Sequence, residues 1–251
     1  MTKASRRPMI VAVFGGSKDV PRDVLDLAQC AGKRISARGF VILTGGMKET
    51  QLCPKTVKDA ALTGVAIDGH WIGVLKDGND PDFKRHDEGG VVYSHMNHQR
   101  NFLEASLCDA AIVLKGAKGT ISEGVSTLCL GKPVLLAGTN WTKECFPLYQ
   151  LFKAHVLTEN RKSDLVKTVL DRLGTGNESG PMRHLIAATV RPDNVLLSEH
   201  SRLVPAAGLE ACEAIARWLV ELETLPRTGE FPELKGYEQV KEKYDEWLKR
   251  L

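Results

Sequence analysis

Short apolar runs, many of them rich in β-branched residues, alternate along most of the chain with longer stretches in which apolar residues recur at helical spacing. Runs that are apolar along their whole length are typical of strands buried on both faces of a parallel sheet. The pattern predicts strands at residues 9–14, 40–43, 71–75, 110–114, 133–137 and 155–157.

Amphipathic helices are predicted between these strands. The first, over residues 24–35, is closed by Gly39, which suits the left-handed position after a helix. Strand–helix units that repeat with right-handed crossovers build a doubly wound sheet. We therefore expect an α/β fold with a Rossmann-like parallel sheet covered by helices on both faces. The other predicted helices lie at residues 56–62, 97–107, 120–130 and 164–173.

Two polar segments interrupt the alternation. Residues 76–94 form a long polar segment, and loops of that length inside a compact domain are often lids or binding loops. Residues 174–180 predict a flexible connector. We therefore expect a Rossmann-like nucleotide- or phosphate-binding domain at residues 8–174 and a mostly helical C-terminal extension at residues 175–251. Within the extension the pattern predicts a strand near residues 194–197 and helices at residues 209–222 and 233–251.

Composition and charge exclude several classes of protein. Of the 251 residues, 43% are hydrophobic and 26% are charged, which excludes a disordered charged polymer. The 34 basic and 31 acidic residues are spread along the chain and leave a formal charge of +3, so no broad basic surface for a nucleic-acid duplex is predicted. No apolar run is long enough to cross a bilayer, and the start lacks the pattern of a signal peptide. We expect a cytoplasmic protein that binds neither nucleic acid nor membrane.

The cysteines are far apart and include no C-x-x-C pair. Reduced cysteines behave as small apolar residues, and several here stand among apolar neighbours. Free thiols in a cytosolic chain explain the spacing better than a disulfide framework or a zinc site. The six are Cys30, Cys53, Cys108, Cys129, Cys145 and Cys212.

Glycines follow three of the predicted strands. In a doubly wound sheet, ligands bind beyond the carboxyl ends of the strands, where the strand order reverses. Glycine lets the backbone approach a ligand, and the start of the next helix favours an anion. A tight strand ending also explains any one of these glycines, but three such ends together favour a phosphate site. The candidate residues are Gly15, Gly16, Ser17, Gly45, Gly46, Gly116 and Gly119.

The segment after the fourth predicted main strand combines a glycine with polar residues that can bind an anion. Thr120 and Glu123 have the T-x-x-E spacing of a capping box, which is a structural explanation sufficient in itself. The functional alternative places Thr120 and nearby N–H groups on a phosphate, with Glu123 facing the attached sugar. Lys118 would add positive charge there, although a loop lysine is more often solvated.

Arg100 is a charged residue on an otherwise apolar helical stripe. A buried arginine needs a partner, which Glu104, Glu123 or a ligand phosphate or carboxylate would supply. We favour the ligand. His95 and His98 lack a nearby acidic ligand set, so no metal site is predicted. No dinucleotide fingerprint, Walker motif or nucleophile elbow is present, and we expect no cofactor.

Five segments within residues 8–173 form a recognisable pattern in chain order: V-A-V-F-G-G-S, I-L-T-G-G, Q-R-N, D-A-A-I-V-L-K-G-A-K-G-T-I-S-E and G-K-P-V. In these segments the chain resembles the LOG-type, lysine-decarboxylase-like superfamily, which includes cytokinin-activating phosphoribohydrolases and molybdenum-cofactor carrier proteins. The resemblance implies a homodimer or a higher homo-oligomer. By position it also implies that Gly116, Gly119 and Thr120 bind a nucleotide phosphate, and that Glu123 and Arg100 are catalytic.

The resemblance leaves two functions open. One is a nucleotide N-glycosidase that splits a nucleoside 5′-monophosphate into base and ribose 5-phosphate. The other is a non-catalytic carrier or sensor of a phosphorylated pterin or a signalling nucleotide. Lys115 and Ala117 stand where the hydrolase motif has proline and its second glycine, and Asn101 after Arg100 is common in the carrier-like branch. The two functions differ in geometry, since catalysis requires Arg100 and Glu123 to converge on one open cavity.

Overall fold

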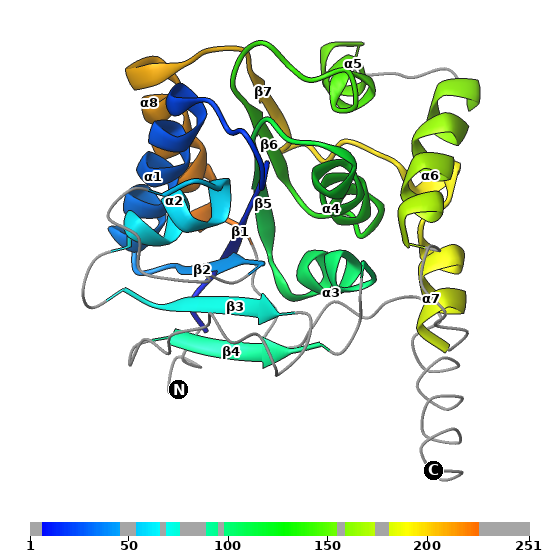
Figure 1. The fold of residues 1–251 in the computed structure, drawn as a ribbon, viewed down its shortest axis with the longest axis horizontal. Helices are drawn as coiled ribbons and strands as arrows, with labels where there is room; N and C mark the ends of the chain where they lie inside the picture. The colour runs from blue at the N-terminus through cyan, green and yellow to red at the C-terminus, as the bar shows by residue number, and fades with distance from the viewer. Residues whose placement is uncertain are drawn as a thin grey trace, which may run out of the picture.

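The computed structural model describes residues 7–45, 54–65, 69–75, 89–94, 98–154, 159–173 and 181–225. Within these residues seven strands form one sheet in the order β4-β3-β2-β1-β5-β6-β7. Every neighbouring pair is parallel, and the order reverses between β1 and β5 (Figure 1). This arrangement confirms the predicted Rossmann-like α/β fold. The strands are β1 (Ile10–Phe14), β2 (Val41–Thr44), β3 (Trp71–Leu75), β4 (Gly89–Tyr93), β5 (Ala110–Val113), β6 (Val134–Ala137) and β7 (Arg202–Val204).

The central strands are buried on both faces, which explains their uniformly apolar sequences. In β1, Val11 and Val13 pack into one core, while Ala12 and Phe14 pack into the other. Two hydrophobic cores therefore share one sheet, and alternate residues of each strand serve each of them.

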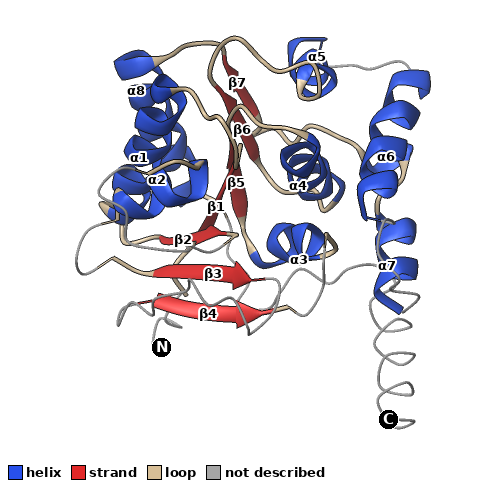
Figure 2. Ribbon diagram, viewed as in Figure 1, coloured by secondary structure: helices blue, strands red, loops and turns tan. Residues whose placement is uncertain are grey.

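Helices cover both faces of the sheet (Figures 1 and 2). One face carries α1 (Arg22–Ser36), α2 (Val57–Thr63) and α8 (Gly208–Glu223). The other carries α3 (Arg100–Leu107) and α4 (Lys118–Cys129), with α6 (Glu159–Leu173) packed outside α4. That second layer also includes α5 (Phe146–Ala154), α7 (Pro181–Thr189) and the short 3₁₀ helix η1 (Pro192–Asn194).

Helices α1 and α2 touch through their backbones at two glycines. A Cβ atom on Gly32 would overlap the carbonyl oxygen of Ala61, and one on Gly64 would overlap that of Gln29. Neither position has room for any side chain, so the close packing of these two helices depends on glycine at both.

Four of the described helices and strands differ from the prediction. Strand β4 lies in the segment predicted as a loop, because its glycine-led sequence hides the apolar pattern of Val91 and Val92. The strand expected at residues 194–197 lies instead at Arg202–Val204. Helices α5 and α7 were not predicted. The strand predicted at residues 155–157, the connector at residues 174–180 and the last helix at residues 233–251 lie outside the described residues.

The domain division at residue 174 remains a prediction. Strand β7 and helix α8 follow that position, and they complete the sheet and one of its cores.

Cys30 on α1 and Cys212 on α8 form a disulfide bond, with their Cα atoms 6.0 Å apart. The prediction of free thiols is therefore wrong for this pair. The two cysteines are 182 residues apart, and only the packing of α8 on α1 brings them together. Cys108, Cys129 and Cys145 are free. Among the described helices, none has the length and apolar character needed to span a membrane.

Candidate functional site

A cavity of about 570 Å³ opens at the carboxyl ends of the strands, where the sheet order reverses between β1 and β5. This is the position expected for ligands in a doubly wound sheet. Gly116 lies directly behind the lining, and Gly46 is outside the described residues. The cavity brings together Gly15, Gly16, Ser17, Gly45, Arg100, Lys118, Gly119, Thr120 and Glu123 from the sequence-predicted set.

The ends of β1 and β5 are tied to each other at this point. The N–H of Gly16 donates to the carbonyl oxygen of Lys115 at 3.0 Å, and the carbonyl oxygen of Gly16 accepts from the N–H of Val57 at 3.0 Å. A Cβ on Gly15 would lie 2.6–2.9 Å from the side chain of Val57. These two glycines therefore also allow α2 to pack closely under the cavity.

Helix α4 begins at Lys118, with Ala117 as an N-cap whose side chain makes no capping hydrogen bond. The capping-box prediction is therefore wrong, because the helix starts before Thr120 and places it within the first turn. The N–H groups of the first turn of a helix have no carbonyl partner within it, and they favour a bound anion. Gly119 and Thr120 line the cavity at this helix start.

Gly116 fixes the loop that leads into α4. A Cβ at this position would overlap the hydroxyl oxygen of Thr120. The carbonyl oxygen of Gly116 accepts hydrogen bonds from the Thr142 hydroxyl at 2.5 Å and from the Cys145 thiol at 3.2 Å. These hydrogen bonds hold the loop on the side away from the cavity, and its other side faces the cavity.

Helix α3 is held against α4 and at its own C-terminal end. The side-chain amide of Asn101 donates to the Ser122 hydroxyl at 2.6 Å. The buried ammonium of Lys132 donates to the carbonyl oxygens of Ala105, Ser106 and Cys108 at 2.7–2.9 Å. Cations at the end of a helix bind its last carbonyl groups favourably. These contacts fix the position of the charged residues that α3 carries into the site.

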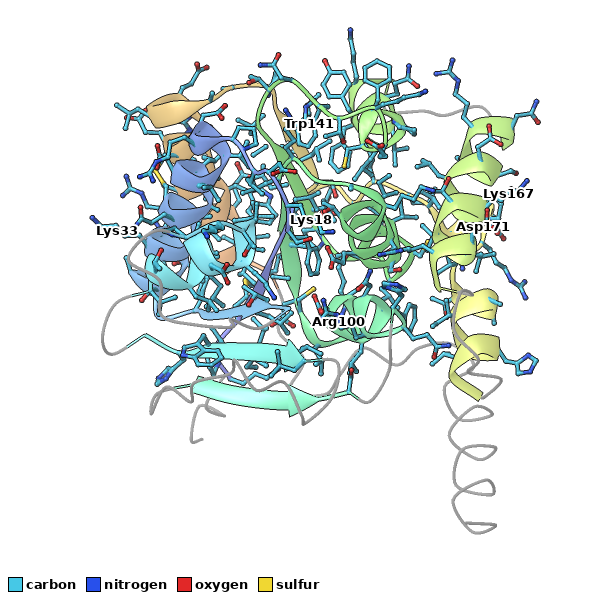
Figure 3. The ribbon with its side chains drawn as sticks, in the orientation of Figure 1. Lys18, Lys33, Arg100, Trp141, Lys167 and Asp171 are labelled. Carbon is cyan, nitrogen blue, oxygen red and sulfur yellow. A yellow bond between two sulfur atoms is a disulfide. The ribbon has the colours of Figure 1, made fainter. Side chains whose placement is uncertain are left out.

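Arg100 stands at the start of α3, near the carboxyl end of β3 (Figure 3). Its Nε lies 3.7 Å from Oε1 of Glu104, and its Nη1 lies 3.5 Å from the carbonyl oxygen of Val74. The Arg100 side chain is 27% exposed. Among the described residues no ion pair joins Arg100 to Glu123, so the arginine and this glutamate line the same cavity without direct contact.

Glu104 is a residue of the cavity that the sequence did not single out as part of the site. Its side chain is 1% exposed, and neither carboxylate oxygen has a hydrogen-bond partner among the described residues. Burial raises the pKa of Glu104 to about 7, against the opposing effect of Arg100 and Lys58. The i, i+4 spacing from Arg100 was the available sequence signal, but it equally suits an ordinary surface ion pair.

Glu123 on α4 is half-buried and faces the same cavity. Burial and the neighbouring Glu104 raise the pKa of Glu123 well above its usual range, while Arg100, Lys58 and Arg172 oppose the shift. The cavity therefore contains two carboxyl groups of raised pKa among several cations. Sequence reasoning missed Lys58 and Arg172, since a helix-surface lysine and arginine give no local sign of facing a cavity.

No metal site is evident in the described part of the chain, where no group of three or more histidine, cysteine, aspartate or glutamate residues could hold an ion. His98 lines the cavity, and His95 lies outside the described residues.

A protein-family model matches residues 8–168 of the chain, which is more than half of its length. The chain belongs to the SLOG cluster4 family. This confirms the resemblance to the LOG-type superfamily drawn from the glycine motifs and from the Q-R-N sequence. The match covers all the residues placed at the cavity except Arg172.

Solved structures of similar fold include a molybdenum cofactor binding protein and a molybdenum cofactor carrier protein. The molybdenum cofactor binding protein of Rippkaea orientalis is 24% identical, with 66% of this chain and 99% of that chain covered and a TM-score of 0.49. The molybdenum cofactor carrier protein of Chlamydomonas reinhardtii is 21% identical, with 85% and 99% covered and a TM-score of 0.49. No curated protein matches the chain.

The Gly116→Ala variant tests whether the loop that leads into α4 binds an anion. The new methyl group would overlap the Thr120 hydroxyl, so either the loop or the first turn of α4 must move. We expect binding of ribose 5-phosphate, measured by calorimetry, to weaken by about 100-fold or more, because a single hydrogen bond to a charged group contributes about 1.5–3 kcal/mol and several are displaced together. Gly90→Ala on β4 is the control, because it makes the same chemical change away from the cavity lining and its new methyl group meets no atom within 4 Å. If Gly116→Ala binds the ligand as tightly as Gly90→Ala does, the loop is not the anion cradle.

Proposed function

We propose that the chain is a nucleotide N-glycosidase, which hydrolyses a nucleoside 5′-monophosphate to a free base and ribose 5-phosphate. The observation that carries the proposal is that Arg100 and Glu123 face one open cavity beside the start of α4 and are not paired with each other. A purely structural ion pair would be in contact and closed to solvent.

The start of α4 would anchor the phosphate, which takes no part in the reaction. Fixing a non-reacting group in this way places the N-glycosidic bond within reach of Glu123 and makes the reaction effectively unimolecular. Breaking that bond leaves positive charge on the sugar, as in other glycoside hydrolyses. Glu123 would stabilise this charge and orient the attacking water, and Arg100 would hold the sugar or the departing base.

A second candidate function is a non-catalytic carrier or sensor of a phosphorylated pterin or signalling nucleotide. It is favoured by Lys115 and Ala117, which replace residues of the hydrolase motif. Both residues lie in the loop that leads into α4, and the carbonyl oxygen of Lys115 is bonded to the N–H of Gly16. Such a carrier needs the same anion cradle and no chemistry.

The Glu123→Ala variant separates the two functions. Purified protein is incubated with a panel of nucleoside 5′-monophosphates, and free base is followed by chromatography. We expect the wild type to release base from at least one of them, and Glu123→Ala to release it about 100- to 1,000-fold more slowly, the usual cost of losing one group that stabilises transition-state charge. Calorimetry with ribose 5-phosphate should show binding by both proteins, because the phosphate is held by the backbone.

Glu144→Ala is the matched control, since Glu144 also lines the cavity but is exposed. Equal base release by the wild type and Glu123→Ala would exclude Glu123 from catalysis. Absence of base release, together with tight binding of a phosphorylated ligand that Arg100 or Thr120 substitutions abolish, would replace the enzyme with the carrier.

A further inference from the structure

We propose that Glu104 is a further functional residue of this site, and that the two acids Glu104 and Glu123 together retain one proton in the cavity. This inference deepens the proposed function, because it concerns the same cavity and the same ligand. Its central test needs no catalysis, so the two proposals can fail separately.

The first observation is geometric. Glu104 on α3 and Glu123 on α4 both line the cavity, and the two helices are fixed to each other next to them by the hydrogen bond from Asn101 to Ser122. Glu104 also lies at the end of β2, where a Cβ on Gly45 would stand 3.5 Å from its Oε1. Two acids thus approach one cavity from neighbouring, mutually fixed elements.

The second observation concerns the oxygens of Glu104. A buried carboxylate is costly unless it is hydrogen-bonded or closely paired. Glu104 has no hydrogen-bond partner among the described residues, and its ion pair with the Arg100 Nε is long at 3.7 Å, beyond hydrogen-bonding distance. A carboxyl group in this position is stabilised by taking up a proton or by contact with a ligand.

Charged groups face this pair from every neighbouring element. Cations come from α2, α3 and α6, and the second acid comes from α4. These cations keep one negative charge favourable, while two carboxylates in one cavity repel each other, so the pair is stable with one proton and one charge. The groups are Lys58, Arg100, Arg172 and Glu123, with His98, Lys118 and Glu144 also lining the cavity.

The shared proton fits the proposed reaction. As the bond between the sugar C1′ and the base nitrogen breaks, its electron pair goes to the base, and the protonated carboxyl gives its proton to that nitrogen. Water then adds to C1′, and its released proton returns to the pair. Glu104 would act as a positioning residue, because it determines where the proton of Glu123 resides and keeps Arg100 at the cavity.

The test is a pH titration of the full chain labelled with ¹³C at the glutamate side-chain carboxyl carbons, followed by NMR from pH 4 to pH 9. Glu104→Gln and Glu123→Gln identify the two resonances, and Glu144→Gln is the control for the same chemical change at an exposed position of the cavity. Both key variants are isosteric amides, and Glu123→Gln leaves the buried Glu104 intact. The titration is repeated with saturating ribose 5-phosphate.

We expect Glu104 to titrate near pH 7 in the wild type because of its burial, and Glu123 to titrate at a lower pH in Glu104→Gln, where the neighbouring acid is gone. Glu144→Gln should leave both midpoints unchanged, and ribose 5-phosphate should raise them, because the added negative charge favours the protonated pair. An ordinary Glu104 midpoint near pH 4–5, or a Glu123 midpoint that Glu104→Gln does not move, would overturn the proposal. Failure to release base from any nucleotide, with these midpoints observed, would remove the hydrolase and leave the proton-sharing pair.

Discussion

The Gly32→Ala variant is expected to lose about 3–5 kcal/mol of its free energy of unfolding, enough to leave a typical domain largely unfolded at 37 °C. The added methyl group would overlap the backbone carbonyl oxygen of Ala61 on α2, and a backbone atom cannot be moved aside by changing a rotamer. Helices α1 and α2 would have to separate, which exposes part of the apolar core that they cover. Urea denaturation followed by circular dichroism measures the change.

The matched control for this variant is Gly119→Ala, the same substitution in the first turn of α4. Its methyl group meets nothing nearer than the Asn101 side-chain nitrogen at 3.9 Å, and alanine favours the helix over glycine by about 1 kcal/mol. We therefore expect Gly119→Ala to be at least as stable as the wild type. Equal stability of Gly32→Ala and Gly119→Ala would show that α1 and α2 are not in backbone contact.

Glu104 is expected to make the stability of the chain fall as the pH rises. A group whose pKa is raised on folding contributes stability that is fully present below its unfolded pKa and is lost as the pH rises through its folded pKa. For Glu104 that window runs from about pH 4.5 to about pH 7. A shift of this size corresponds to about 3 kcal/mol. The physical cause is the burial of a carboxylate without a hydrogen-bond partner.

The Glu104→Gln variant should lack this part of the pH dependence, since an amide does not titrate. Relative to the wild type, we expect the variant to gain about 3 kcal/mol in unfolding free energy between pH 4.5 and pH 8. Urea denaturation of both proteins at the two pH values measures the difference, and Glu144→Gln should follow the wild type at both. A constant difference between Glu104→Gln and the wild type across this range would mean that Glu104 is ionised throughout.

The fold was largely predictable because its central strands are buried on both faces, so that apolar runs such as residues 110–114 are unambiguous. Elements at the edge of the sheet and in its outer layers were not predictable in this way. Strand β4 begins with Gly89 and Gly90 and lies at the edge of the sheet, where an apolar pattern is weakest. The Cys30–Cys212 bond depends on the packing of α8 against α1, which no local pattern encodes.

Only the backbone part of the site was predictable from the sequence. Glycines at strand ends and the segment that starts α4 follow from local rules, whereas the start of the helix itself was misplaced because Thr120 and Glu123 imitate a capping box. Glu104, Lys58 and Arg172 come from three different helices and meet only in the folded chain. Whether a charged helical residue faces solvent or a cavity is decided by the neighbouring helices, and the sequence of its own helix does not contain that information.

The hydrogen bond from the Cys145 thiol to the carbonyl oxygen of Gly116 makes this thiol a reporter of the opening of the loop that leads into α4. The thiol is fully buried and its pKa is raised by burial, so an alkylating reagent can modify it only while the loop is displaced. When opening and closing are fast, the labelling rate reports the population of the opened loop. Ribose 5-phosphate at 100 times its dissociation constant should then slow the labelling of Cys145 by about 100-fold. Cys108 is buried at the far end of α3, and its labelling rate should not change. This comparison distinguishes local opening of the loop from unfolding of the whole molecule.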